Sequence, residues 1–158
     1  MLNGDGDVDF EFSVSGILSG HSQDVKYLKW NPNKDLLFSA SYDNSIKCWK
    51  FEESADDWLC EYTIDGHFST VWQIDFDPTG NYLCSCSEDK TWSIWRVDEK
   101  GFQNLGVIAG THLRSIYCMS WSKINLPQYS LVCTGGSDNR INLFQISSES
   151  LQSPASKQ

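Results

Sequence analysis

The chain has 158 residues, of which 40% are hydrophobic and 13% aromatic, enough to build the core of one domain of ordinary size. A formal net charge of −9 disfavours binding to nucleic-acid phosphates and to anionic membrane surfaces. No apolar run approaches the roughly 18 residues of a membrane span, and the acidic N-terminus does not read as a signal peptide, so we expect neither a membrane nor a nucleic-acid partner.

The cysteine pattern indicates the cellular compartment in which the protein resides. No two cysteines form a C-x-x-C pair, and several lie in apolar, strand-like runs. We therefore expect reduced, buried thiols and a cytoplasmic protein, with the nucleus as a second compartment. The six are Cys48, Cys60, Cys84, Cys86, Cys118 and Cys133.

In chain order, we expect a flexible acidic N-terminus over residues 1–10, and then a repeat domain over residues 11–146. "GHSQDVKYLKWNP" from Gly20 is repeated as "GHFSTVWQIDFDP" from Gly66, and "SASYDNSIKCW" from Ser39 as "SCSEDKTWSIW" from Ser85, in each case 46 residues later. A weaker third copy begins at Gly110. The repeats therefore cover about residues 20–50, 66–96 and 110–145, and residues 147–158 form a polar C-terminal tail.

Within each unit the apolar residues alternate, which predicts β-strands, and helical periodicity is absent. In the second unit we expect strands at 71–76, 82–87 and 92–97, with a weaker fourth near 106–109. A leading strand near 11–18, two units of four strands and one of three make twelve strands in all.

Gly-His at one end and a strand ending in Trp at the other, repeated with a period in the mid-forties, resemble the WD-repeat family. The family's Trp-Asp pair is eroded here to Trp49-Lys50, Trp95-Arg96 and Phe144-Gln145. The resemblance implies an all-β fold of β-propeller blades, about three of an expected seven. We therefore expect a fragment or a truncated isoform, and the alternative is closure by self-association, because open blade edges invite pairing.

The resemblance also implies a structural hydrogen-bond tetrad of His, Ser or Thr, Asp and Trp in each unit. Phe144 has no indole N–H, so the third network is expected to be incomplete. The tetrad positions are His21, Ser39, Asp43 and Trp49, then His67, Ser85, Asp89 and Trp95, then His112, Thr134 and Asp138.

Two chemical alternatives compete with this interpretation. Ser85, His67 and Asp89 are the residue types of a hydrolase triad, but the serine lies within a strand and on no G-x-S-x-G elbow, and the pattern occurs three times. Cys84 and Cys86 lie on one face of a strand and could bind a metal, but the corresponding residues of the first unit are apolar. We therefore expect no catalytic residues, no metal and no cofactor.

If the tetrads are scaffold, function lies at the mouth of the propeller channel, where WD-repeat proteins commonly bind partners. Positions three and five after each Gly-His histidine, and the residue before the turn Asp, are expected there. These predicted partner-binding residues are Asp24, Lys26, Tyr42, Thr70, Trp72, Glu88, Ser115, Tyr117 and Ser137.

At finer resolution, "SASYDNSIKCWKFEESADDWLC" and "GHFSTVWQIDFDPTGNYLCSCSEDKTWSIWRV" resemble the branch of the family that serves cytosolic iron–sulfur protein assembly. This resemblance implies a non-enzymatic scaffold whose partners are other subunits of the assembly targeting complex and client apoproteins. The alternative is a generic adaptor, such as a ubiquitin-ligase substrate receptor or a signalling scaffold.

Overall fold

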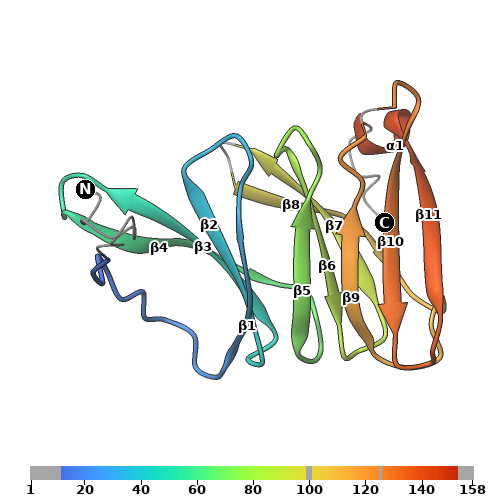
Figure 1. The fold of residues 1–158 in the computed structure, drawn as a ribbon, viewed down its shortest axis with the longest axis horizontal. Helices are drawn as coiled ribbons and strands as arrows, with labels where there is room; N and C mark the ends of the chain where they lie inside the picture. The colour runs from blue at the N-terminus through green and yellow to red at the C-terminus, as the bar shows by residue number, and fades with distance from the viewer. Residues whose placement is uncertain (1–11, 99–100, 125, 153–158) are drawn as a thin grey trace, which may run out of the picture.

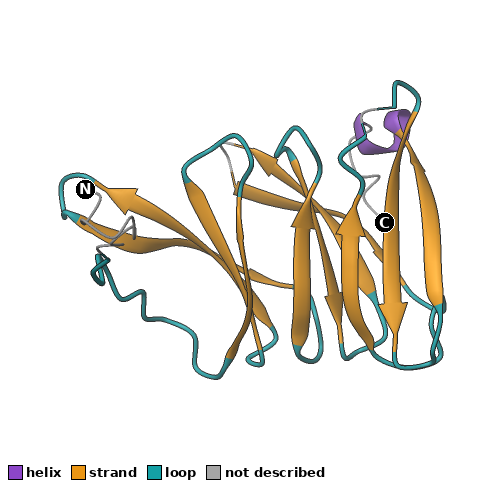
Figure 2. Ribbon diagram, in the orientation of Figure 1, coloured by secondary structure: helices purple, strands orange, loops and turns teal. Residues whose placement is uncertain are grey.

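The computed structural model describes residues 12–98, 101–124 and 126–152 (Figure 1). The expected flexible N-terminus over residues 1–10 and the last part of the expected tail, residues 153–158, lie outside the described residues. The described part contains eleven strands in three antiparallel sheets and one short helix (Figure 2). The all-β prediction is confirmed.

Each repeat forms one sheet whose strands follow one another in chain order. The first sheet contains β1 (Val25–Trp30), β2 (Leu36–Ser41), β3 (Ser45–Glu52) and β4 (Asp57–Asp65). The second contains β5 (Val71–Phe76), β6 (Tyr82–Ser87), β7 (Trp92–Asp98) and β8 (Gly101–Ile108). The third contains β9 (Ile116–Trp121), β10 (Tyr129–Gly136) and β11 (Ile141–Ser147), and α1 (Ser148–Gln152) follows it.

The three sheets stand side by side, and their first strands are neighbours. β5 lies between β1 and β9 (Figure 1). This is the arrangement of successive propeller blades, in which the first strand of each blade lines the central axis. The residues before β5 and β9 gather at one end of the assembly, and α1 lies at the other (Figure 1).

Two apolar clusters join the sheets. Phe38 and Ile46 of the first sheet pack against Phe76 and Leu83 of the second, and all four are almost completely buried. The rings of Phe38 and Phe76 meet edge to face, with centroids 5.0 Å apart. A second cluster fills the space between the second and third sheets, and burial of this apolar area drives their association.

The turns explain where the strands begin. The Asp77 side chain accepts hydrogen bonds from the backbone N–H groups of Thr79 and Tyr82, and Gly80 adopts a positive φ of 70°. The equivalent turn of the first repeat reaches across to this one, because the Asn31 amide donates to the Gly80 carbonyl at 2.8 Å. Neighbouring turns are therefore locked together as well as closed individually.

Two expectations were wrong. Residues 12–18 form no strand, and Phe12, Val14 and Ile17 are exposed, because these residues pair with no strand of the described chain. Within the expected polar tail the short helix α1 forms, with Leu151 buried and its carbonyl accepting a hydrogen bond from the Tyr82 hydroxyl.

The second error concerns the cysteines. Cys48, Cys84 and Cys86 are buried, but Cys60 and Cys118 are exposed, Cys60 on the outer strand β4 and Cys118 on the open side of the third sheet. All six thiols are free.

Candidate functional site

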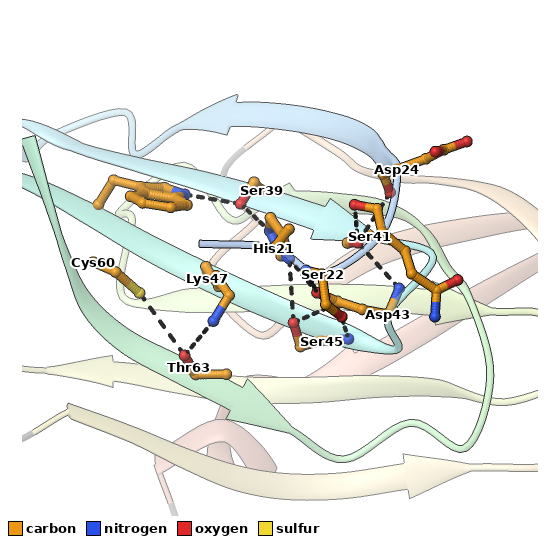
Figure 3. Close-up of polar contacts among 12 residues, drawn as sticks. His21, Ser22, Asp24, Ser39, Ser41, Asp43, Ser45, Lys47, Cys60 and Thr63 are labelled. Atoms are coloured by element: carbon orange, nitrogen blue, oxygen red, sulfur yellow. Dashed lines mark hydrogen bonds and ion pairs between the residues drawn. The ribbon is translucent and has the colours of Figure 1, made fainter. Parts of the chain in front are cut away.

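The predicted tetrad residues of the first repeat lie together in one hydrogen-bonded chain (Figure 3). The Trp49 indole N–H donates to the Ser39 hydroxyl oxygen at 2.8 Å, and Ser39 lies 2.6 Å from His21 Nε2. His21 Nδ1 lies 2.8 Å from the Asp43 carboxylate. Because an indole only donates and a carboxylate only accepts, Ser39 accepts from Trp49 and His21 donates through Nδ1 to Asp43.

The second repeat contains the same series of hydrogen bonds, made by the same atoms of the equivalent residues. Trp95 donates to Ser85 at 2.9 Å, Ser85 lies 2.8 Å from His67 Nε2, and His67 Nδ1 lies 3.0 Å from Asp89. In the third repeat, His112 contacts Thr134 at 2.8 Å and Asp138 at 2.9 Å. Phe144 stands at the tryptophan position and has no N–H to donate.

The carboxylates are held in their charged form. Burial alone would raise the pKa of Asp89, but hydrogen bonds from His67, Thr91 and the Phe68 N–H outweigh it and hold the pKa well below its usual range. For Asp138, hydrogen bonds from His112 and then from the Leu113 N–H lower the pKa to about 2. Each carboxylate thus fastens the loop before the first strand to a turn later in the same repeat.

Sequence reasoning missed other members of these networks. Ser45 and Thr91 each donate a 2.6 Å hydrogen bond to the carboxylate two residues before them. The signal was present in the recurring D-N-S and D-K-T triplets, because a hydroxyl two residues after Asp closes a local turn.

The glycines of the two Gly-His pairs lie against the tetrad tryptophans. A Cβ added to Gly20 would lie 3.1 Å from the Trp49 ring, and one added to Gly66 would collide with the Trp95 ring. In the third repeat, where the tryptophan is absent, Thr111 precedes His112 in place of glycine.

The triad-like group around Ser85 is closed to substrate. The Ser85 side chain is completely buried, and its oxygen already accepts the Trp95 indole N–H. A serine nucleophile must reach an acyl carbon and stand beside an oxyanion hole. This geometry therefore supports a structural role for the group.

Cys84 and Cys86 are equally enclosed. Burial raises the pKa of both thiols well above the ordinary value, and it raises the pKa of Cys48 to about 12. The thiolate is the form that ligates metals and attacks electrophiles, so these side chains act as small apolar core residues.

The predicted partner-binding residues gather where the inner strands begin. Lys26, Trp72 and Tyr117 sit at irregularities of pairing in β1, β5 and β9, each between two residues that pair in register while it does not. A bulge of this kind re-aims a side chain and bends the strand. The three bulges therefore turn these side chains to the same end of the molecule.

Their contacts run across the sheets. The Lys26 ammonium lies 5.3 Å from the Tyr42 ring centroid and 5.8 Å from that of Trp72. Trp72 and Tyr117 meet edge to face at 5.4 Å, so both pack between neighbouring blades. Tyr42 and Tyr117 nevertheless keep 48% of their surface exposed.

Glu88 links the second and third sheets. One carboxylate oxygen accepts the Trp72 indole N–H at 2.8 Å, and the other accepts the Ser115 hydroxyl at 2.7 Å. Asp24 lies 2.9 Å from the Lys26 ammonium. Polar and aromatic side chains thus alternate along this end of the molecule.

Two of the nine predicted positions are not available to a partner. Thr70 and Ser115 are buried, and their carbonyls accept backbone hydrogen bonds from Glu88 and Ser137. We name the remaining seven the entrance surface, namely Asp24, Lys26, Tyr42, Trp72, Glu88, Tyr117 and Ser137.

The row of three antiparallel sheets and the His–Asp contact within each repeat define the class of protein. It is an array of β-propeller blades, each fastened by its own tetrad residues. Residues 12–50 and 58–96 match the family "WD domain, G-beta repeat". The chain belongs to the WD-repeat family.

Its similarity to curated proteins is more specific. It is 38% identical over 127 residues to "Probable cytosolic iron-sulfur protein assembly protein CIAO1 homolog" of Ixodes scapularis, covering 78% of this chain and 38% of the relative. It is 26% identical over 176 residues to "Probable cytosolic iron-sulfur protein assembly protein 1" of Chaetomium globosum, covering 88% of this chain and 38% of the relative. The chain therefore spans about two fifths of the length of these curated relatives.

A shorter similarity points elsewhere in the family. "F-box-like/WD repeat-containing protein TBL1X" of Macaca fascicularis is 38% identical over 52 residues, 33% of this chain and 9% of that protein. Within the described ranges, no helix is both long enough and apolar enough to cross a membrane.

Proposed function

We propose that this chain is part of a non-enzymatic WD-repeat scaffold of cytosolic iron–sulfur protein assembly, acting in the cytoplasm. Its partners are other subunits of the assembly machinery and client apoproteins, which it holds together so that clusters reach their targets. The observation that carries the proposal is the similarity to two iron–sulfur assembly proteins over 78% and 88% of the chain.

The geometry of the two candidate sites supports a scaffold. The tetrads consume their hydroxyl, imidazole and carboxylate groups in buried mutual hydrogen bonds, so they stabilise blades rather than turn over a substrate. The entrance surface, by contrast, offers exposed tyrosines among fixed charges, a composition enriched at protein–protein contacts.

The test is affinity capture from cytosol with the tagged chain, followed by quantification of known iron–sulfur assembly factors and client apoproteins. Tyr117→Ala and Lys26→Glu change the entrance surface, and we expect both to reduce recovery of these proteins. Leu59→Ala is the matched control, since Leu59 is 45% exposed but lies on the outer strand β4. No recovery by the unchanged chain, or equal losses in all three variants, would contradict the proposal.

The second candidate is a generic adaptor, favoured by the short similarity to the F-box-like protein. The same capture separates the two, because an adaptor of that kind recovers ubiquitin-ligase or signalling subunits in place of iron–sulfur factors. The similarity behind it covers only 33% of this chain, so we place it second.

A further inference from the structure

The helix α1 lies in a groove between the second and third sheets. Leu151 is the one buried residue among its five, and its side chain packs into the apolar cluster that joins the two sheets. Its backbone carbonyl accepts hydrogen bonds from the Tyr82 hydroxyl at 3.1 Å and from Arg96 Nη2 at 2.6 Å, both on the second sheet. The groove therefore holds this segment as it would hold a bound peptide, through one apolar anchor and one recognised carbonyl.

The repeat itself does not require these two donors. Tyr82 and Arg96 are paired neighbours on β6 and β7, and the residues 46 positions earlier, Leu36 and Lys50, pair in the same way on β2 and β3. Arg96 also stands where the family's Trp-Asp pair has its aspartate, so a cation replaces an anion there. The blade fold therefore forms without a hydroxyl at this place, and in the second sheet the hydroxyl and the guanidinium both serve the Leu151 carbonyl.

The groove is built on fixed elements and is only partly filled. The Tyr82 ring stacks on Trp121 of β9, with centroids 6.5 Å apart, and Arg96 lies on β7, between β6 and β8. A cavity of about 230 Å³ lies beside α1, lined by Asp77 of the second repeat and Pro127 of the third. The groove therefore has room for a segment that is longer or bulkier than α1.

The way in which residues 147–152 occupy the groove defines what it accepts. Ser147 Oγ accepts the Ser150 backbone N–H at 3.1 Å, which is the hydrogen bond of a helix N-cap. Leu151 follows this cap by four residues, whereas Glu149 and Gln152 are exposed and can vary. The groove therefore selects a hydroxyl residue four positions before a leucine.

We propose that this groove is a binding site for a short helical segment of a partner protein, with a hydroxyl residue four positions before a leucine. Residues 147–152 are its internal occupant, and the partner's segment displaces them. A helix in a groove is a common mode of peptide recognition, in which a few apolar anchors supply most of the affinity. The site lies at the end of the molecule opposite the entrance surface, so both ends can be occupied at once (Figure 1).

A second copy of the chain is a less suitable occupant. α1 begins at Ser148, directly after β11 ends at Ser147, and Ser148 donates its backbone N–H to the Gln128 carbonyl at 3.0 Å. Exchange of α1 between copies needs a hinge, and the chain offers no residue for one between the strand and the helix. The occupant is therefore a different protein. This assignment rests on the contacts of α1 and does not depend on a role in iron–sulfur assembly.

The test is nuclear magnetic resonance spectroscopy of the isotope-labelled full chain, titrated with the peptide SSESLQ, which has the sequence of residues 147–152 and is blocked at both ends. Leu151→Asp places a charge in the apolar site and releases α1. In this variant we expect the peptide to shift the Trp121 indole resonance saturably, while the Trp72 indole resonance, at the entrance surface, stays unchanged. In the unchanged chain the peptide should bind at least about ten-fold more weakly, because the tethered α1 competes at a high effective concentration.

Matched variants of the Leu151→Asp chain test how the peptide is recognised. Arg96→Gln removes a charged donor from the anchor carbonyl and should weaken binding by about ten-fold or more. Lys50→Gln changes the equivalent residue of the first repeat and should leave binding unaltered. The peptide SSESDQ, in which aspartate replaces the leucine, should not bind. If Leu151→Asp disrupts the amide spectrum of the blades, Leu151→Ala removes most of the anchor without adding a charge and takes its place.

Several outcomes would overturn the proposal. If the Trp121 resonance of the Leu151→Asp chain shows no saturable shift, or if SSESLQ and SSESDQ bind equally, the groove is not a binding site. Equal effects of Arg96→Gln and Lys50→Gln would exclude recognition through the carbonyl. A dimer of the unchanged chain that Leu151→Asp abolishes, measured by light scattering, would overturn the assignment to a different protein. None of these measurements involves iron–sulfur factors, so their failure is distinct from failure of the affinity capture.

Discussion

Replacing Asp89 by alanine tests whether the tetrads hold the blades together. The carboxylate accepts hydrogen bonds from His67 Nδ1 at 3.0 Å, the Phe68 N–H at 2.9 Å, and the N–H and hydroxyl of Thr91 at 2.9 and 2.6 Å. The variant leaves all of these donors without their acceptor. The free energy of unfolding that the variant loses depends on which of these donors can hydrogen-bond to water instead.

Only His67 is deeply enclosed, with 1% of its side chain exposed, and the Phe68 N–H is at the surface. One buried donor left unpaired costs about 1–3 kcal/mol, and the others recover most of their hydrogen bonding from water. We therefore expect Asp89→Ala to lower the free energy of unfolding by about 1–3 kcal/mol. Asp89→Asn keeps one acceptor oxygen and should lose less.

Urea denaturation followed by tryptophan fluorescence measures this difference, and thermal melting should show a Tm decrease of roughly 2–4 °C for each kcal/mol. Asp65→Ala is the control, because Asp65 is an exposed aspartate at the end of β4. If Asp89→Ala is no more destabilising than Asp65→Ala, the structural assignment of the tetrads is refuted.

Two further predictions concern the turns next to these carboxylates. Lys90 adopts a φ of 70° at the position where Asn44 and Asn139 adopt 70° and 65°, so Lys90→Asn should stabilise the chain by about 1 kcal/mol in urea denaturation, and an unchanged or lower stability would contradict this. The pKa of Asp138 is about 2 in the folded chain, below the unfolded value of about 4, so its stabilising effect is present above about pH 4 and is lost as pH falls towards 2. Asp138→Asn should therefore flatten the dependence of unfolding free energy on pH across that window, and a slope equal to that of the unchanged chain would contradict the assignment.

The strands predicted from the sequence were accurate where local alternation is strong. The observed bounds of β5 and β6 are those expected, and β7 extends one residue further. The fourth strand begins at Gly101, earlier than expected, because pairing with β7 rather than local pattern sets its start. Residues 12–18 carry a similar pattern and form no strand, since a strand also needs a partner.

Long-range contacts account for the other differences. The helix α1 is too short to be stable from its own propensity. It is held because the Leu151 side chain is buried and its carbonyl accepts hydrogen bonds from Tyr82 and Arg96, which are more than 50 residues away in sequence. No local sequence pattern in the tail predicts those contacts.

The candidate site, like the fold, could be predicted only in part from the sequence. Repeat spacing identified the tetrad residues and the entrance positions, because every repeat places equivalent residues in equivalent environments. It could not show that Thr70 is buried while Tyr117 is half exposed, since that depends on the bulge in β9 and on the packing of neighbouring sheets. Nor could it show that Lys26 is already held between two aromatic rings.

The third repeat shows how the parts of a tetrad depend on one another. Where Phe144 replaces tryptophan, Thr111 stands in place of the glycine that packs on the tryptophan ring, and Gly136 stands where Ser41 and Ser87 support the turn in the other repeats. The His112–Asp138 contact persists at 2.9 Å. The His–Asp pair therefore forms without the indole, and the indole adds a connection between the third strand and the second.

The tryptophan indole is missing from the third sheet, whose outer strand β11 has no further strand paired with it in the described chain. An indole N–H that joins β3 to β2 in the first repeat and β7 to β6 in the second has no counterpart between β11 and β10. Backbone pairing, side-chain packing and a hydrogen bond from the Asn142 amide to the Thr111 carbonyl hold β11 in place from its inner side. A strand paired along its outer edge would stabilise the third sheet by adding backbone hydrogen bonds and cross-strand side-chain contacts.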